Sequence, residues 1–400
     1  MIQTASLPSR VARREFNRRS LFDIGHGTGM NEAIQTSIAS LNAYATAYPH
    51  WVITYSGGKD SSAVVSFVLW AIMHHHVPTP DTLTVLYVDT RMELPPLVVT
   101  AKQVLAAVRE MGHQAIKVEP RYTERYWVNL LGRGLPPPRL QTRWCTRLLK
   151  QKPMDRVMQQ LQATYGPSST LFITGVRMGE STARDDRIIA SCSRDDGECG
   201  QGWFQQQRHA LAPLVHWRVC WVWRWLYDAL NPLPVMREIE PVYKADDIVD
   251  IRTGCIGCNL VEYDWALHYL VKTPEWSHLH PFMKLKALYE EMRRPQYRLR
   301  RRAFVKADGS ISASKSQALG PLTIDARQHF FDRVRALEAE AHYTLINDRE
   351  ETLIRRLWRW GAYPQRWQGD EARGDELFEK LAIVDGEVVA RQLLLPGMRP

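Results

Sequence analysis

Short apolar runs alternate with helix-like stretches over the first half of the chain. Four runs are predicted to be buried strands, because they are short, apolar and bounded by turn-forming residues; they cover residues 51–55, 82–88, 115–119 and 171–176. Helical patterns occupy residues 63–75, 95–111 and 153–163. The alternation predicts an α/β fold with a doubly wound parallel sheet that helices cover on both faces.

Beyond about residue 205 the pattern becomes tryptophan-rich and helical. We expect most of these tryptophans to lie in the core, because indole rings bury large apolar areas; they are Trp217, Trp221, Trp223 and Trp225. Residues 276–302 carry basic helix formers, residues 307–320 predict a connector rich in Ser, Ala and Gly, and residues 322–360 predict one or two amphipathic helices.

These changes of pattern predict four regions. They are a basic N-terminal segment at residues 1–40, a core domain at 41–205, a tryptophan-rich helical region at 206–306 and a helical C-terminal extension at 307–400.

Composition indicates a globular protein with a sizeable core, since 45% of its 400 residues are hydrophobic and 24% are charged. The chain has no run of about eighteen apolar residues, and its Arg-rich start lacks the apolar region of a signal peptide. We therefore expect a cytoplasmic protein with no membrane partner.

The segment Tyr-Ser-Gly-Gly-Lys-Asp-Ser-Ser at residues 55–62 joins the first predicted strand to the first predicted helix. Its glycines let backbone N–H groups approach an anion, and its serines add hydroxyl donors at the positive end of the helix. The spacing is neither that of a Walker A motif nor that of a dinucleotide-binding G-x-G-x-x-G loop. We predict a polyphosphate site formed by Ser56, Gly57, Gly58, Lys59, Asp60, Ser61 and Ser62. The alternative is a glycine-rich turn that binds nothing.

Two more loops follow predicted strands and should meet this site, since ligands of such sheets lie at the carboxyl ends of the strands. Asp89 begins an Asp-Thr-Arg-Met-Glu-Leu-Pro segment that supplies two carboxylates. Arg177 lies in Gly-Val-Arg-Met-Gly-Glu-Ser, where it could clamp phosphate oxygens while Gly175 allows a close backbone approach. Strand-end capping and surface charge are the alternatives.

The six cysteines favour metal or redox roles over disulfides. Cys255 and Cys258 form a C-x-x-C pair, which could bind zinc, occupy two corners of an iron–sulfur cluster or exchange disulfides. Cys145 is framed by four cations, which we expect to lower its pKa and favour the thiolate. Unrelated core cysteines are the alternative.

These motifs resemble those of known families. The loop at residues 56–61 resembles the S-G-G-x-D-S signature of the PP-loop ATP pyrophosphatases, which cleave ATP between its α- and β-phosphates. That resemblance implies an adenine nucleotide α-hydrolase-like fold. The segments at Asp89 and Arg177 resemble the phosphoadenosine-phosphosulfate reductase branch. The order W-C-T-x-x-L-K-x-x-P, G-V-R-x-x-E-S and G-C-x-x-C resembles the sulfurtransferase component of bacterial DNA phosphorothioation systems (DndC/SspD type) over residues 45–275.

By this resemblance Cys145, Cys255 and Cys258 are ligands of a [4Fe-4S] cluster. The cysteine that family members place just before the C-x-x-C is missing, and we favour Cys199 as the fourth ligand because neighbouring glycines leave it room. We expect Cys220 to be a core residue. The alternative is a Zn²⁺ site formed by Cys192, Cys199, Cys255 and Cys258. The reductases of this branch use a mobile C-terminal cysteine as the nucleophile. No cysteine follows Cys258 in this sequence, so a sulfonucleotide reductase mechanism would lack that nucleophile.

The net charge of +9 is concentrated in part between residues 293 and 306. Such a segment suits a phosphate backbone, and Tyr297 and Phe304 could stack on bases. A solvated basic helix is the alternative. We predict DNA contacts from Arg293, Arg294, Arg298, Arg300, Arg301 and Arg302.

The favoured function is DNA phosphorothioation. ATP and Mg²⁺ bind the phosphate loop, an acceptor oxygen attacks the α-phosphorus, and sulfur then displaces AMP. We expect Lys59 to neutralise the pyrophosphate, and Asp60 and Asp89 to contact Mg²⁺. The implied partners are DNA, a cysteine desulfurase or other sulfur donor, and other phosphorothioation-system proteins.

Two other functions remain. One is a different PP-loop enzyme, either a tRNA thiolase or a sulfonucleotide-metabolising protein. The other is a nucleotide-sensing module that binds nucleic acid and has a degenerate catalytic site.

Overall fold

The computed structural model describes residues 29–179, 182–191, 203–205, 209–233, 236–243, 254–301, 318–376, 378–384 and 387–394. The chain forms two compact units from interleaved segments. Unit 1 combines Met1–Glu119 with Gln151–Gly254, and unit 2 combines Pro120–Lys150 with Cys255–Pro400. These two units differ from the four consecutive regions predicted from the sequence. The boundaries at residues 40, 205 and 306 stay predictions.

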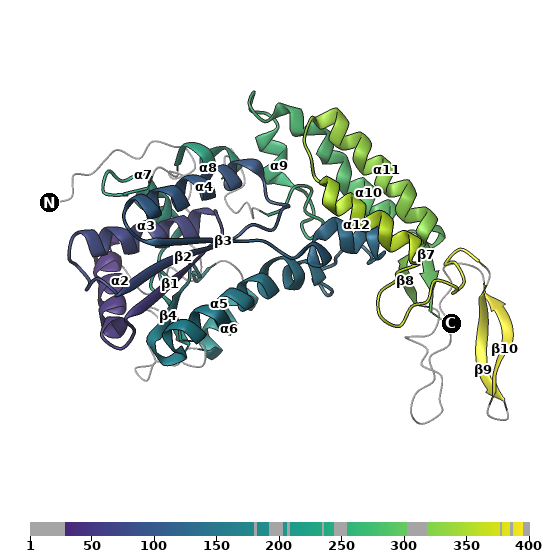
Figure 1. The fold of residues 1–400 in the computed structure, drawn as a ribbon, viewed down its shortest axis with the longest axis horizontal. Coiled ribbons are helices and arrows are strands. Elements are labelled where there is room, and N and C mark those ends of the chain that lie inside the picture. The colour runs from purple at the N-terminus through teal and green to yellow at the C-terminus, as the bar shows by residue number, and fades with distance from the viewer. Residues whose placement is uncertain are drawn as a thin grey trace. The chain divides into compact units, whose positions relative to one another are not determined.

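Unit 1 contains a six-stranded sheet in the order β3-β2-β1-β4-β6-β5 (Figure 1). All neighbouring strands are parallel except the pair of β5 and β6. The strands are β1 (His50–Tyr55), β2 (Thr82–Val88), β3 (Gln114–Val118), β4 (Thr170–Ile173), β5 (Trp203–Gln205) and β6 (Ala210–Ala212). The predicted doubly wound α/β fold is confirmed.

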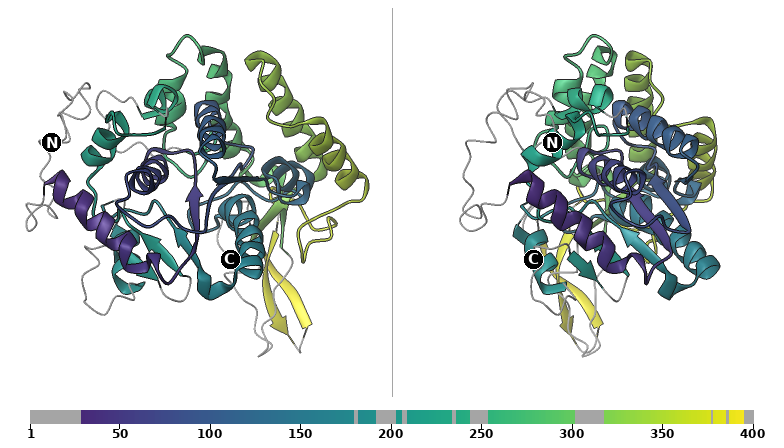
Figure 2. Two further views of the ribbon diagram at one scale, coloured as in Figure 1. Left: turned by 60° about the vertical axis from the view of Figure 1, so that its left-hand side comes forward. Right: turned by 90° about the vertical axis from the view of Figure 1, so that its left-hand side faces the viewer.

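Helices cover both faces of this sheet. Figures 1 and 2 show α3 and α4 on one face and α5 on the other. The helices of unit 1 are α2 (Met30–Ala45), α3 (Lys59–Met73), α4 (Pro95–Glu110), α5 (Lys152–Tyr165), α6 (Thr182–Ser191), α7 (Val219–Tyr227) and α8 (Met236–Tyr243). The three helices and first three strands predicted from periodicity lie within a few residues of these bounds.

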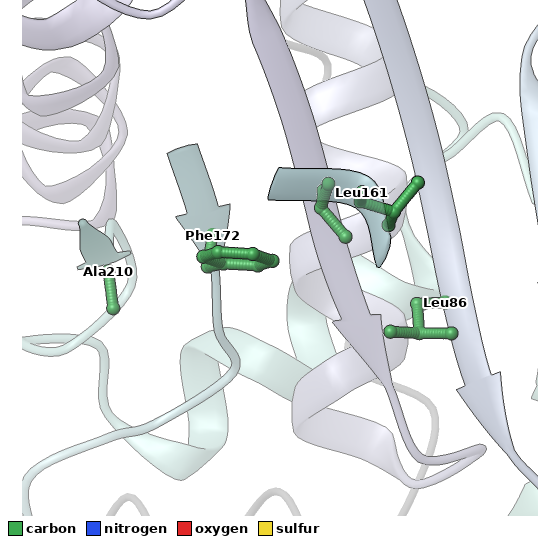
Figure 3. Close-up of a cluster of buried hydrophobic side chains, with 5 residues drawn as sticks. Leu86, Leu161, Phe172 and Ala210 are labelled. Carbon is green, nitrogen blue, oxygen red and sulfur yellow. The ribbon is translucent and has the colours of Figure 1, made fainter. Parts of the chain in front are cut away.

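Successive side chains of a strand point to opposite faces of the sheet. The apolar side chains of these strands therefore contribute to a core on each face. On the α5 face, Val52, Leu86 and Phe172 of three neighbouring strands pack with Leu161 of α5 and with Ala210 (Figure 3). The strand β4 ends at Ile173, earlier than predicted. Its continuation leaves the sheet to form a loop, in which the Met178 N–H donates to the carbonyl of Val215.

The tryptophan-rich segment packs against α3, and the prediction that its tryptophans are core residues is confirmed. Trp217, Trp221, Trp223 and Trp225 are 1%, 9%, 7% and 1% exposed. The indole N–H of Trp225 donates to the Ser66 hydroxyl at 2.8 Å, and its ring lies 5.1 Å from that of Trp70. The polar edge of this buried ring is therefore satisfied within the core.

Unit 2 is mainly helical. Its helical segments are η2 (Tyr122–Glu124), η3 (Val128–Gly132), η4 (Thr146–Gln151), α9 (Trp265–Leu270), η8 (Ser277–Lys284), α10 (Leu285–Glu291), η9 (Pro295–Tyr297), α11 (Ile324–Ala341) and α12 (Asp348–Arg359). Its strands form two antiparallel pairs, β7 (Arg298–Arg300) with β8 (Leu319–Leu322) and β9 (Phe378–Val384) with β10 (Glu387–Leu394). The amphipathic helices predicted for residues 322–360 are present, whereas the strands of the C-terminal extension were not predicted.

Buried arginines organise unit 2. Arg327 is 0% exposed, and its guanidinium donates to the carbonyls of Leu322, Gly132 and Ala362 at 3.0, 3.0 and 2.8 Å. A charged donor in this position satisfies carbonyls that would otherwise be buried without partners. Segments distant in the sequence are thereby held together.

No helix among the residues that the structure describes is long and apolar enough to cross a bilayer.

Candidate active site

The order of the strands reverses between β1 and β4, which are neighbours in the sheet although β2 and β3 separate them in the sequence. Ligands of open α/β sheets bind at such a switch point, beyond the carboxyl ends of the strands. The loops that follow β1 and β4 meet here. A Cβ atom added to Gly175 would lie 3.0 Å from both Cα and N of Ser61, which is tighter than almost all real Cβ contacts, so glycine favours this close approach.

The loop after β1 has the geometry of a phosphate cradle. Gly57 has φ +79°, and a Cβ atom there would lie 2.9 Å from the carbonyl oxygen of Leu97. Gly58 is the N-cap of α3, so the amides of the first helical turn open onto the loop, although the Lys59 amide donates to the Tyr243 hydroxyl. The Ser61 hydroxyl lies 2.9 Å from that of Ser56 and 3.0 Å from the Gly58 carbonyl, which fixes the bend.

Ser62 takes a different place from the one predicted. It is 0% exposed, and its hydroxyl lies 3.3 Å from that of Tyr55. In this structure Ser62 therefore supports the loop from inside the protein rather than facing a ligand.

Asp60 joins the two loops through ion pairs. Its carboxylate accepts from Arg177 Nε at 2.7 Å and from Lys59 Nζ at 3.0 Å. Arg177 is 4% exposed and also donates to the Trp217 carbonyl at 3.1 Å. Burial alone would raise the pKa of Asp60, but the charges of Arg177 and Lys59 hold that pKa below its ordinary value. Asp60 is thus an anion that positions both cations.

Asp89 lies at the end of β2 and is 2% exposed. Its carboxylate accepts from the Arg91 N–H at 2.9 Å and pairs with Lys117 Nζ at 2.8 Å. Burial opposes the charge of Lys117, but hydrogen bonds to Asp89 and Glu119 raise its pKa overall. Both carboxylates predicted to contact Mg²⁺ are therefore engaged by cations in this structure.

Tyr243, the last residue of α8, is a site residue that the sequence did not reveal. Its phenol oxygen accepts from the Lys59 N–H at 3.1 Å, and the Lys59 ammonium lies 5.2 Å from its ring centroid. Its ring also packs edge-on against Trp223 at 5.3 Å. The phenol occupies an amide donor that a phosphate would use. No sequence signal connects Tyr243 to the loop, because the contact spans 184 positions.

Three of the predicted metal ligands, Cys145, Cys255 and Cys258, belong to unit 2. The charged forms of all three interact with the buried Tyr289, which is hydrogen-bonded to Tyr126. Burial and then the negative charges of the thiolates raise the pKa of Tyr289. The three thiols therefore lie near one tyrosine pair, and their role as a ligand set stays a prediction.

The structure does not support a low pKa for Cys145. Burial and the neighbouring Cys258 charge raise it, and hydrogen bonds to Thr146 only partly oppose this effect. The expectation of a lowered pKa was wrong because Arg143 and Arg147 are exposed, so water screens their charges. The described residues contain no group of three or more His, Cys, Asp or Glu that could hold a metal ion.

The remaining cysteines are Cys192, Cys199 and Cys220. Cys199 and Cys192 lie outside the described residues. Cys220 is partly buried in α7, which belongs to unit 1. The other three described cysteines belong to unit 2.

The predicted basic DNA-binding segment is divided in the structure. Arg298 and Arg300 are 6% and 7% exposed, in strand β7. Arg298 donates to the carbonyls of Gly320 and Leu319, and Arg300 donates to that of Glu376. These two guanidiniums have structural partners and do not form a free phosphate-binding surface.

The other arginines of the segment differ. Arg294 is exposed and Arg293 is partly buried, while the Arg301 guanidinium lies 5.6 Å from the ring centroid of Trp367. Arg302 lies outside the described residues, as do Glu180 and Ser181 of the loop after β4.

Residues 50–237 match the family model of the phosphoadenosine phosphosulfate reductase domain. The matched residues span the six-stranded sheet of unit 1, so this part of the chain is similar to that domain. The match includes the phosphate loop, Asp89, Cys145 and Arg177, and it ends before Cys255 and Cys258. No curated protein matches the chain.

Two solved structures are similar to the chain at a distance. One is an NMN synthetase from Francisella tularensis, with a TM-score of 0.30 and 12% identity over 56% of this chain and 85% of that chain. The other is the U34-tRNA thiolase NcsA from Methanococcus maripaludis with its [4Fe-4S] cluster, with a TM-score of 0.33 and 11% identity over 66% and 79% of the two chains. Similarity this distant carries no conclusion about substrate or cofactor.

Removal of the Tyr243 hydroxyl should strengthen ATP binding. In Tyr243→Phe, the Lys59 amide loses its acceptor in the free protein and regains one when phosphate binds, so the Kd should fall about fivefold, equivalent to about 1 kcal/mol. Calorimetry with an ATP analogue that has a methylene bridge between the α- and β-phosphorus measures this change.

The matched control is Tyr227→Phe, since the Tyr227 hydroxyl bonds Glu240 rather than the loop. Its Kd should equal that of the wild type. Weaker analogue binding in Tyr243→Phe would mean that the phenol assists the nucleotide instead of competing with it.

Proposed function

We propose that the protein is an ATP pyrophosphatase that adenylates an oxygen acceptor, favoured here as a DNA backbone phosphate, so that sulfur can replace the oxygen. The main support is the glycine cradle at the N-terminus of α3, placed at the sheet switch point of a phosphoadenosine phosphosulfate reductase domain. Backbone amides of a helix N-terminus and a lysine at one point suit a leaving pyrophosphate.

The first chemical step follows from that placement. An acceptor oxygen forms a bond to the α-phosphorus of ATP, and the bond to the bridging oxygen breaks, so that pyrophosphate leaves with the electron pair. The amides of the first turn of α3 and the Lys59 ammonium oppose its growing negative charge. Asp60 keeps Lys59 at the loop through their 3.0 Å ion pair.

Arg177 acts mainly as a positioning residue in this proposal. Its Nε is committed to Asp60 and its Nη1 to the Trp217 carbonyl. It ties the loop after β4 to the start of α3, which keeps the cradle rigid before the nucleotide binds.

The second step exchanges the atoms. Sulfur at the oxidation level of sulfide forms a bond to the acceptor phosphorus, and the bond to the adenylated oxygen breaks, releasing AMP. A cysteine desulfurase or another donor would supply the sulfur, with other phosphorothioation proteins as partners. The described residues contain no metal-binding group, so neither step is assigned to a cluster.

The nucleotide chemistry predicts AMP and pyrophosphate as products of ATP. Ser56→Ala and Lys59→Ala should each slow turnover by about a hundredfold if these groups stabilise the departing charge. Lys102→Ala is the matched control, since Lys102 is exposed on α4. Chromatography of labelled ATP identifies the products, and formation of ADP with orthophosphate would refute the assignment.

The acceptor is tested by mass spectrometry of nuclease-digested nucleic acids from cells with and without this gene. We expect phosphorothioate-linked dinucleotides in DNA only when the gene is present. Sulfur found in tRNA bases but absent from DNA would select the tRNA thiolase. A sulfonucleotide product with unmodified nucleic acids would select a small-molecule enzyme, and no sulfur transfer at all would favour the sensing module.

Metal or cluster binding is a separate part of the proposal, and it rests on the cysteine motifs of the sequence. Protein purified without oxygen should be brown and contain iron and acid-labile sulfide, and Cys145→Ser, Cys255→Ser and Cys258→Ser should each remove the colour. Cys220→Ser is the control and should keep the metal content. Colourless protein with stoichiometric zinc would assign the thiols a structural role.

A further inference from the structure

Two segments of unit 2 are strongly basic. Residues 125–150 contain six Lys and Arg residues and no acid, and residues 292–301 contain five arginines and no acid. Such a composition is typical of surfaces that bind polyanions. The segments are far apart in the sequence, so only the fold can combine them.

The fold joins these segments at one carbonyl. The Pro138 oxygen accepts from Arg293 Nη2 at 3.2 Å and from Asn259 Nδ2 at 2.7 Å. Immediately after it, an isolated β-bridge pairs Arg139 with Thr142, and Arg143 Nε donates to the Leu140 carbonyl at 3.1 Å. Residues 138–143, which we call the basic turn, are thus held beside Arg293.

The structure sorts the arginines of unit 2 into two classes. Arg298, Arg300 and Arg327 are buried and donate to main-chain carbonyls. Arg139 and Arg143 of the basic turn are exposed, as is Arg294. The second class can reach a phosphate without breaking these bonds, and Arg293 is intermediate, since it is partly buried and donates to Pro138 through Nη2 alone among the bonds that the structure gives it.

Like charges crowd at this place. Burial and then the charges of Arg139 and Arg293 lower the pKa of Arg298 to about 10. Burial and Arg139 also lower the pKa of Arg293, although the nearby Glu290 opposes this effect. Arg293 Nε is buried and has no hydrogen-bond partner among the described residues. A polyanion bound here would relieve this repulsion.

We propose that the basic turn, together with Arg293 and Arg294, binds the phosphate backbone of the DNA acceptor. The inference rests on the proposed function for the choice of DNA. It replaces the continuous basic segment predicted from the sequence with a surface assembled from two parts of unit 2. Cys145 follows the basic turn by two residues, so bound DNA would lie in the same unit as the thiols of Cys145, Cys255 and Cys258.

The test is the salt dependence of duplex DNA binding by the full-length protein. Fluorescence anisotropy at several salt concentrations gives the slope of log K against log salt, to which each phosphate contact contributes about 0.9. Arg139→Ala combined with Arg143→Ala should flatten the slope by about 1.8 units. Arg139→Lys combined with Arg143→Lys should retain the wild-type slope, because counterion release depends on charge.

Arg349→Ala combined with Arg359→Ala removes the same charge from exposed positions on α12. This control should keep the wild-type slope, and all variants should keep the Kd for the ATP analogue. An equal loss in the control would show an effect of net charge alone and overturn the surface. An unchanged slope in the basic-turn alanine variant, with ATP binding intact, would also overturn it.

The outcomes separate this proposal from the proposed function. If the wild type binds DNA and releases pyrophosphate while the basic turn has no effect, only the surface fails. If the wild type binds tRNA but not duplex DNA, both the surface as stated and the choice of DNA as acceptor fail, whereas the adenylation chemistry stands.

Discussion

The carboxylate of Asp60 connects the parts of unit 1 on which the candidate active site depends. It pairs with Lys59 at the start of α3 and with Arg177 in the loop after β4. Both Asp60 and Lys59 are partly buried, so removing one partner would leave a charge with reduced access to water. The pairing therefore fixes the two loops against each other. Little space remains between them, since a Cβ atom added to Gly175 would lie 3.0 Å from Cα of Ser61.

This constraint changes the roles of the charged residues. Asp60 pairs with two cations, so these three groups keep one net positive charge, while Lys117 pairs with both Asp89 and Glu119. In the proposed function, backbone amides at the N-terminus of α3 would add to this charge when an anion binds, and one of them bonds Tyr243. A bound nucleotide would thus replace hydrogen bonds of the free protein, such as the one from the Lys59 amide to Tyr243, with its own. Its affinity would depend on the difference in free energy between the bonds lost and the bonds gained.

Unit 2 uses arginine in two ways. Long guanidinium side chains such as Arg327 cross between segments and satisfy carbonyls that lie in the interior. Others, such as Arg139 and Arg294, remain at the surface. The composition of the sequence does not distinguish the buried arginines from the exposed ones. This is why a basic run suggested one continuous nucleic-acid surface, although its β7 arginines belong to the interior.

The sequence by itself determined the α/β alternation and the phosphate loop, because both depend on local physics: strands and helices have different periodicities, and the turn at Gly57 needs a positive φ. The tertiary structure alone decided which loops meet. It placed Gly175 against Ser61, Tyr243 on the Lys59 amide and Pro138 beside Arg293. It also reversed the expected pKa shift of Cys145, since desolvation and screening depend on what surrounds a group in space rather than along the chain.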